Sequence, residues 1–190
     1  MSDRKSRQAD TPSVEIVAGT PEYPRLPELH ALIADVYATS DTMSESFAER
    51  YPDPAALAGE LAAISCLPGA LFLVAEATGQ PCGYLSVKPR RASRLRHTAD
   101  LQLGVGSAQR RRGLGRRLLA DALARLAAGR VIEIVYLMVR ADHGAAIALY
   151  ASAGFERLAT LQRDTRVGER YFDGVLMRRF VGVPAPVAER

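Results

Sequence analysis

The chain has few of the features that would place it in a membrane, a disulfide scaffold or a structural zinc site. No segment approaches the roughly 18 consecutive apolar residues that a membrane span requires, and the N-terminus lacks the apolar core of a signal peptide. The two cysteines, Cys66 and Cys82, have no CxxC spacing and are too few for a disulfide framework. We therefore expect a cytoplasmic protein with no metal and no membrane partner.

Lysine is scarce, because Lys5 and Lys88 are the only lysines among 25 basic residues in a chain of net charge +4. The remaining basic residues are arginines, and clusters of arginines suit anionic ligands such as phosphates. A recognised nucleic-acid docking motif is missing, so we do not expect a nucleic-acid partner. The two clusters are Arg90, Arg91, Arg94 and Arg96, then Arg110, Arg111, Arg112, Arg116 and Arg117.

The length and apolar content of the chain predict one domain. A chain of 190 residues with 48% hydrophobic content can bury a core of ordinary size. Residues 1–12 are polar and charged, and residues 181–190 repeat Pro, Ala and Val without periodicity, so both ends are predicted to be disordered tails. The folded domain is expected at residues 13–180.

The periodicity of apolar residues predicts an α/β fold. The run at 131–139 is almost continuously apolar, which predicts a strand buried on both faces, and Asp142 is expected to cap the helix that follows. The segment 40–53 is expected to be a loop. The order of elements predicts a mixed sheet with helices on both faces. Strands are expected at 14–17, 70–77, 82–88, 99–105, 131–139, 155–161 and 171–180, and helices at 26–36, 54–65, 114–129 and 143–153.

The segment Arg110-Arg111-Arg112-Gly113-Leu114-Gly115 lies between a predicted strand and a predicted helix. Backbone N–H groups and the helix N-terminus converge there, and glycines permit close approach of a phosphate, so the segment predicts a pyrophosphate site. It is neither a Walker loop nor a dinucleotide fingerprint. A glycine turn with a solvated arginine face is the alternative interpretation.

This segment resembles the signature of the GNAT superfamily of N-acetyltransferases, Arg/Gln-x-x-Gly-x-Gly/Ala after a strand that ends in valine. The strand here ends Leu103-Gly104-Val105, and Ala146-Ile147-Ala148-Leu149-Tyr150 followed by Ala153-Gly154-Phe155 is similar to a second family motif. The resemblance implies a mixed, mostly antiparallel central sheet with a splayed strand pair and helices on both faces. It also implies a bulge in the strand at 99–105.

The resemblance further implies that acetyl-CoA is the co-substrate, with no metal. Its pantetheine arm would lie between the strands at 99–105 and 131–139. His143 stands where the family often has asparagine, so its role is a pantetheine contact, an alternative base or an exposed position in a helix. The residues expected to bind acetyl-CoA are Leu103, Gly104 and Val105 through their backbone, Arg111, Gly113, Leu114, Gly115 and Arg116 through their amides, and Arg110, Arg112 and His143 through their side chains.

By the same resemblance, Tyr150 is the candidate acid that protonates the sulfur of coenzyme A, and a backbone N–H near Val105 would hold the oxyanion. An ordinary packed aromatic is the alternative for Tyr150. Asp100 is the candidate base, often acting through water in the family, and a surface or salt-bridged aspartate is its alternative.

The acceptor is expected to be a primary amine that attacks acetyl-CoA directly in a ternary complex. Carboxylates at Glu45, Glu49 and Asp53, with the hairpin through Tyr171, are expected to shape its site. A small molecule such as an amino acid, a polyamine or an antibiotic is the first expectation, and a protein N-terminus or lysine is the alternative. More remote alternatives are a nucleic-acid-binding module and an acetyl-CoA sensor. The resemblance also suggests a homodimer.

Overall fold

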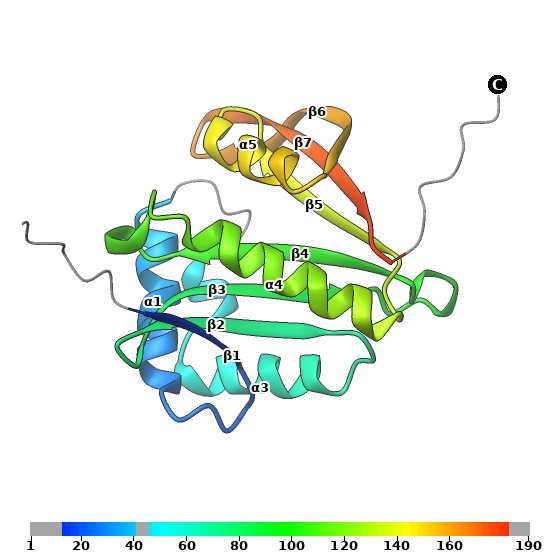
Figure 1. The fold of residues 1–190 in the computed structure, drawn as a ribbon. Helices are drawn as coiled ribbons and strands as arrows, with labels where there is room; N and C mark the ends of the chain where they lie inside the picture. Colours follow the sequence, from blue (N-terminus) through cyan, green and yellow to red (C-terminus); the bar gives the residue numbers. More distant parts are fainter. Residues whose placement is uncertain (1–12, 41–45, 183–190) are drawn as a thin grey trace, which may run out of the picture.

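A computed structural model of the chain describes residues 13–40 and 46–182 (Figure 1). Residues 1–12 and 183–190, where the tails are predicted, lie outside the described residues. The helices are α1 (Leu26–Ala38), α2 (Phe47–Arg50), α3 (Pro54–Ser65), α4 (Leu114–Gly129) and α5 (Gly144–Ser152), with short 3-10 turns η1 (Ser93–Leu95) and η2 (Ser107–Gln109). The strands are β1 (Val14–Ala18), β2 (Leu71–Ala77), β3 (Gln80–Pro89), β4 (Thr98–Val105), β5 (Ile134–Arg140), β6 (Glu156–Val167) and β7 (Arg170–Phe180).

The strands form one seven-stranded sheet in the order β1-β2-β3-β4-β5-β7-β6. Every neighbouring pair is antiparallel except β4 and β5, which are parallel and are connected through α4. A parallel pair needs a long crossover, and the helix predicted at 114–129 supplies it. The mixed sheet expected from the order of elements is therefore confirmed, and it is mostly antiparallel, as the family resemblance implies.

Each face of the sheet packs against its own helices and has its own core. One core joins β2–β5 and β7 to α4 and α5, and the other joins β2 and β3 to α1, α2 and α3. Alternation along β3 divides its side chains, because Leu85 and Val87 enter the first core while Tyr84 enters the second. The helices thus lie on both faces of the sheet, as Figure 1 shows.

Local sequence signals account for the segment between α1 and β2. Asp53 Oδ1 accepts a hydrogen bond of 2.8 Å from the Ala56 N–H, and Pro54 occupies the first turn of α3. The prediction that 40–53 is entirely loop is wrong, because Ser46 and Glu49 form a capping box that starts the short helix α2. This helix becomes one wall of the candidate site.

Two further expectations need correction at β5 and α5. Met138 on β5 is 42% exposed. Helices α4 and α5 cover the other face of this strand and leave the face that carries Met138 open. The strand is therefore buried on one face rather than on both. The cap of α5 is His143, whose Nδ1 accepts from the Ala146 N–H at 3.1 Å, while Asp142 forms an ion pair with Arg140.

Candidate active site between the splayed strands

Strands β4 and β5 separate soon after they meet. They pair only at Thr98 with Ile134, Ala99 with Val135, and Asp100 with Tyr136. β3 continues along the other edge of β4 as far as Val105, while every residue of β5 pairs with β7. Within the described residues, no strand covers the edge of β4 beyond Asp100, so its backbone groups can pair with a ligand.

The splay arises without the bulge that the family resemblance implies for β4. The register of β3 and β4 runs without a shift from Pro89 opposite Ala99 to Gly83 opposite Val105. The strands separate because β5 follows β7 away from β4 after three paired positions. The irregularity on this side of the sheet lies between β2 and β3, where Ala75 and Glu76 pair with Gly83 and Pro81 and Cys82 of β3 is the extra residue.

The glycine-arginine segment forms an anion cradle between η2 and α4. Arg111 and Gly113 adopt left-handed backbone conformations, with φ of 62° and 80°, and Gly113 is the N-cap of α4 without a side-chain cap. Alternating conformations of this kind turn successive N–H groups toward one point, and the positive end of the helix dipole lies beside it. Within the described helix, no acidic side chain occupies the first turn. The segment therefore fits a pyrophosphate.

The two glycines of the cradle serve different purposes. A Cβ on Gly113 would meet no other described atom within 4 Å, so Gly113 is required for its conformation. A Cβ on Gly115 would lie 3.2 Å from Leu149 Cδ2 and 3.5 Å from Leu103 Cδ2. Gly115 therefore allows α4 to lie close to β4 and α5, at the mouth of the splay.

The arginines of the cradle divide into two groups. Arg110 donates to the backbone oxygens of Val105 at 3.1 Å and Thr39 at 3.0 Å, so it ties the loop to the end of α1 rather than facing a phosphate. Arg111, Arg112 and Arg116 are exposed and form no ion pair within the described part of the chain. The backbone of Leu114 belongs to the cradle although its side chain is buried in the core.

Tyr150 lies on α5 and is 7% exposed. Its ring packs edge-on against Phe155, with centroids 5.8 Å apart, and burial raises the pKa of its hydroxyl to about 12. The group therefore keeps its proton at neutral pH, as a general acid must. Its neighbour Leu149 contacts the Gly115 region, so α5 places Tyr150 near the splay.

Asp100 lies at the point where the two strands separate. Its two carboxylate oxygens accept hydrogen bonds of 3.1 and 2.9 Å from Arg90, whose guanidinium also lies over the ring of Tyr136. The Asp100 side chain remains 56% exposed, so water can reach it. The salt-bridged alternative is thus present in the structure, and the role of base stays a prediction.

A polar cavity of about 720 Å³ adjoins Asp100 on the face of the sheet that carries α1 and α3. Its floor comes from alternate residues of β3 and β4, which face each other in the register as Ser86 with Gln102 and Lys88 with Asp100. The remaining walls come from α2 and α3. The lining residues are Glu49, Arg50, Glu60, Ser86, Lys88, Asp100 and Gln102.

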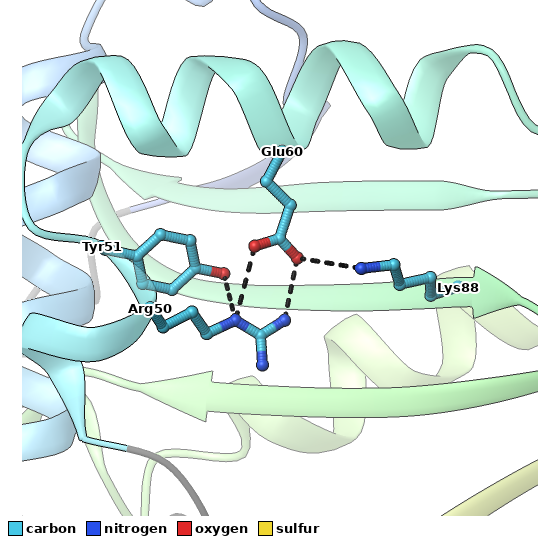
Figure 2. A network of polar contacts seen from close by, with 4 residues as sticks. All are labelled: Arg50, Tyr51, Glu60 and Lys88. Carbon is cyan, nitrogen blue, oxygen red and sulfur yellow. Dashed lines mark hydrogen bonds and ion pairs between the residues drawn. The ribbon is translucent and has the colours of Figure 1, made fainter.

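A network of four side chains borders this cavity, and three of them, Arg50, Glu60 and Lys88, line it (Figure 2). Arg50 Nη2 donates to Glu60 Oε1 at 2.8 Å, and Arg50 Nε donates to the Tyr51 hydroxyl at 3.0 Å. Lys88 Nζ lies 3.9 Å from Glu60 Oε1. Burial alone would raise the pKa of Glu60, but the hydrogen bond and charge of Arg50, with help from Tyr51 and Lys88, lower it. Glu60 is therefore ionised at neutral pH.

Sequence reasoning missed Glu60, although a signal for it exists. Glu60 follows Leu57 by three positions, so it lies toward the apolar face of α3, where a charged residue needs a partner. Of the carboxylates predicted to shape the acceptor site, Glu49 lines the cavity and Asp53 instead caps α3. Glu45 lies outside the described residues.

Two other predicted site residues are held by contacts elsewhere. Tyr171 on the closing hairpin is stacked against Arg163, and it is not among the described residues that line the cavity. His143 uses Nδ1 to cap α5, which leaves Nε2 as the ring nitrogen for any contact with a pantetheine arm.

The comparisons with known proteins agree with this geometry. The model of the Acetyltransferase (GNAT) family matches residues 36–155, and the chain belongs to this family. It is 37% identical over 137 residues to the N-alpha-acetyltransferase RimI of Mycobacterium tuberculosis, covering 70% of this chain and 77% of the relative. The protein is therefore an acetyl-CoA-dependent N-acetyltransferase.

Solved structures share the fold. The ribosomal-protein-alanine N-acetyltransferase of Brucella melitensis superposes with a TM-score of 0.78 at 29% identity, covering 88% of this chain and 99% of that one. A phosphinothricin acetyltransferase from Sinorhizobium meliloti, solved with acetyl-CoA, gives a TM-score of 0.79 at 20% identity, covering 89% of each chain.

Within the described residues, no helix is long and apolar enough to cross a membrane.

Proposed function

We propose that this enzyme acetylates the α-amino group at the N-terminus of a protein. The observation that carries the proposal is the 37% identity to RimI across 77% of its length. The Brucella ribosomal-protein-alanine N-acetyltransferase, at 29% identity, supports the same substrate class. The sequence analysis expects a small-molecule amine first and a protein N-terminus as the alternative. These two relatives favour the protein N-terminus.

In this proposal acetyl-CoA supplies the thioester, and the residues of this chain hold it and move the protons. Backbone groups of Leu103, Gly104 and Val105 would pair with the pantetheine arm along the open edge of β4. Amides from Arg111 to Arg116 would bind the pyrophosphate, with exposed arginine side chains adding positive charge. Residues 13–180 are the proposed extent of the domain.

The chemistry is direct transfer in a ternary complex. The neutral amine attacks the thioester carbonyl carbon, a C–N bond forms and the C–S bond breaks. The departing sulfur takes a proton from Tyr150, and the amine loses its proton through water to Asp100. The high pKa of the buried Tyr150 hydroxyl, about 12, supports the role of acid, and the exposure of Asp100 supports a route through water.

A small amine remains the second candidate because of the dimensions of the cavity. A volume of about 720 Å³ lies within the usual range for small-molecule sites. Its polar lining suits an amino acid or another polar amine.

A cytoplasmic location and a homodimer remain predictions.

The test is a thiol-release assay with acetyl-CoA and three groups of acceptors, combined with calorimetry of acetyl-CoA binding. The groups are peptides with free N-termini, matched Nα-blocked peptides that contain lysine, and free amino acids, polyamines and aminoglycosides. We expect turnover of the free N-termini, with mass spectrometry placing the acetyl group on the α-nitrogen. Turnover of small amines alone would support the second candidate, and acetyl-CoA binding without any turnover would indicate a sensor.

A further inference from the structure

The charges around the acceptor cavity are mostly engaged with one another. Glu60 accepts two hydrogen bonds from Arg50, at 2.8 and 3.4 Å, and Asp100 accepts two from Arg90. Glu49 accepts from the backbone N–H and the hydroxyl of Ser46, at 2.9 and 2.7 Å. Each carboxylate that lines the cavity therefore already has a donor.

Lys88 is held much less firmly than these groups. Its Nζ lies 3.9 Å from Glu60, longer than a charge-assisted hydrogen bond, and its side chain is 45% exposed. Figure 2 shows the ammonium directed toward Glu60, at the end of the network. Glu49 keeps its negative charge, since the groups that donate to it belong to the neutral Ser46, and Lys88 is the cation of the described cavity lining that can still engage an anionic ligand.

The identity of this residue is also unusual for the chain. Among 25 basic residues only Lys5 and Lys88 are lysines, so Lys88 is the one lysine among the residues that the structure describes. A guanidinium at this position would be planar and would compete with Arg50 for both oxygens of Glu60. An ammonium is a compact point charge with three donors, so it can contact Glu60 and a second oxygen together.

The position of Lys88 relates it to the reacting amine. Lys88 faces Asp100 across β3 and β4, and Asp100 marks the point where β4 and β5 begin to separate. An acceptor whose amine reaches the splay at Asp100 therefore brings its neighbouring atoms over Lys88. Ser86 and Gln102 lie one pair further along the same face and add neutral polar groups.

We propose that Lys88 is an anion subsite that binds a carboxylate of the acceptor. Together with the proposed function, on which this inference rests, it predicts a preference for protein N-termini with Asp or Glu among their first few residues. The same arrangement disfavours acceptors that carry further positive charges, such as polyamines.

The experiment compares three peptides that differ only in their second residue, Glu, Gln or Lys, after an N-terminal Ser. For the wild-type enzyme we expect kcat/KM for the Glu peptide to exceed that for the Gln peptide by about tenfold, with the Lys peptide lowest. Lys88→Gln should make the Glu and Gln peptides equivalent. Lys88→Glu should reverse the order, so that the Lys peptide becomes the best acceptor.

The matched control is Arg125→Glu, which changes net charge in the same direction as Lys88→Glu. Arg125 pairs with Asp121 on α4 and does not line the cavity, so the order of the three peptides should stay that of the wild type. Raising the salt concentration should reduce the preference, because Lys88 is partly exposed. If Lys88→Glu does not fold, Lys88→Gln still tests the subsite.

The outcomes separate the two proposals. Equal turnover of the three peptides by the wild type, or an unchanged order in Lys88→Gln, overturns the anion subsite while N-terminal acetylation stands. Turnover of no peptide, with acetyl-CoA still bound, overturns the proposed function and the peptide preference with it. A preference for the Glu peptide that both Lys88 variants abolish supports both proposals.

Discussion

The proposed acetyl-CoA cradle and the proposed acceptor cavity lie on either side of β4, and they are built in different ways. The cradle consists of backbone: left-handed residues at Arg111 and Gly113, an open helix N-terminus and a bare strand edge. The cavity consists of side chains from α2, α3, β3 and β4, held by ion pairs that join α3 to α2 and to β3.

This difference follows from what each site must bind. A pyrophosphate has the same shape in every member of a family that uses acetyl-CoA, so fixed backbone N–H groups suffice. Acceptors differ in shape and charge, and side chains provide that variety. Substitutions in the cradle should therefore act through steric contact and backbone conformation, whereas those in the cavity should act through charge.

The largest effect is expected from Gly115→Val. A Cβ at this position already lies 3.2 Å from Leu149 Cδ2, and the added methyl groups must displace α5 or fill the mouth of the splay. We expect acetyl-CoA affinity to fall about 100-fold, measured by calorimetry, which corresponds to the upper end of typical overpacking costs. Thermal unfolding must show that the variant is folded, and unchanged affinity in the folded variant would contradict the proposed cradle.

Gly113→Ala is the matched control, because its Cβ meets open space. The cost there is that of a left-handed alanine, about 1–2 kcal/mol, without a steric block. Its loss of affinity should therefore be smaller than that of Gly115→Val. The opposite order would mean that conformation matters more than close approach.

An intermediate effect is expected from Tyr150→Phe, which removes the proposed acid and keeps the buried ring. We expect kcat to fall about 100-fold while acetyl-CoA affinity changes little, because only the proton transfer is lost. A residue that served only to pack against Phe155 would leave kcat almost unchanged in this variant. Steady-state kinetics and calorimetry on the same preparation separate the two cases.

The pH dependence of stability provides a second readout for Tyr150. Burial raises the pKa of its hydroxyl from 10.0 to about 12, so the folded protein keeps the proton where the unfolded chain begins to lose it. This contribution is complete below pH 10 and is lost as pH rises toward 12. Tyr150→Phe should therefore lose less stability over that range than the wild type, as urea unfolding at several alkaline pH values can show.

The smallest effect is expected from Glu60→Gln, which keeps the shape of the network and removes its charge. Arg50 and Lys88 then lose their counter-ion at a site where the Glu60 side chain is 15% exposed. We expect a loss of about 2 kcal/mol in the free energy of unfolding at pH 7, below the cost of breaking a fully buried pair.

The difference between Glu60→Gln and the wild type should depend on pH. The pKa of Glu60 is lowered below 4.5 in the folded state, so its contribution is present above that value and is lost as pH falls through the folded pKa. The two proteins should therefore converge in acid. A constant difference between pH 7 and pH 3 would show that the charge of Glu60 is not responsible.

Much of the architecture could be predicted from local signals, and the failures have identifiable causes. Helix α3 begins at Pro54 and ends at Ser65 as predicted, because its cap and apolar stripe are local. α2 was missed because four residues give too short a pattern, and its capping box was the available signal. The cap at Asp142 was wrong because Arg140, two residues away, engages its carboxylate.

For the candidate site, the sequence indicated the cradle and Tyr150 through motifs that are continuous in the chain. It could not indicate the Arg50, Glu60 and Lys88 network, since these residues come from α2, α3 and β3. Nor could it show that Arg110 is tied to Thr39, which caps the C-terminal end of α1. Such contacts depend on how the helices and strands pack together, which the spacing of residues along the chain does not predict.

The sequence by itself determined the order of the strands and of the four longer helices, the two faces of β3 and β4, and the prediction of a backbone-built anion site, because periodicity and glycine placement act over a few residues. Only the tertiary structure decided where β4 and β5 separate, since β5 follows its long pairing with β7. It also decided which charges of the acceptor cavity neutralise one another and that Lys88 keeps the weakest contact. Electrostatic pairing depends on distance in space, and the fold alone sets that distance.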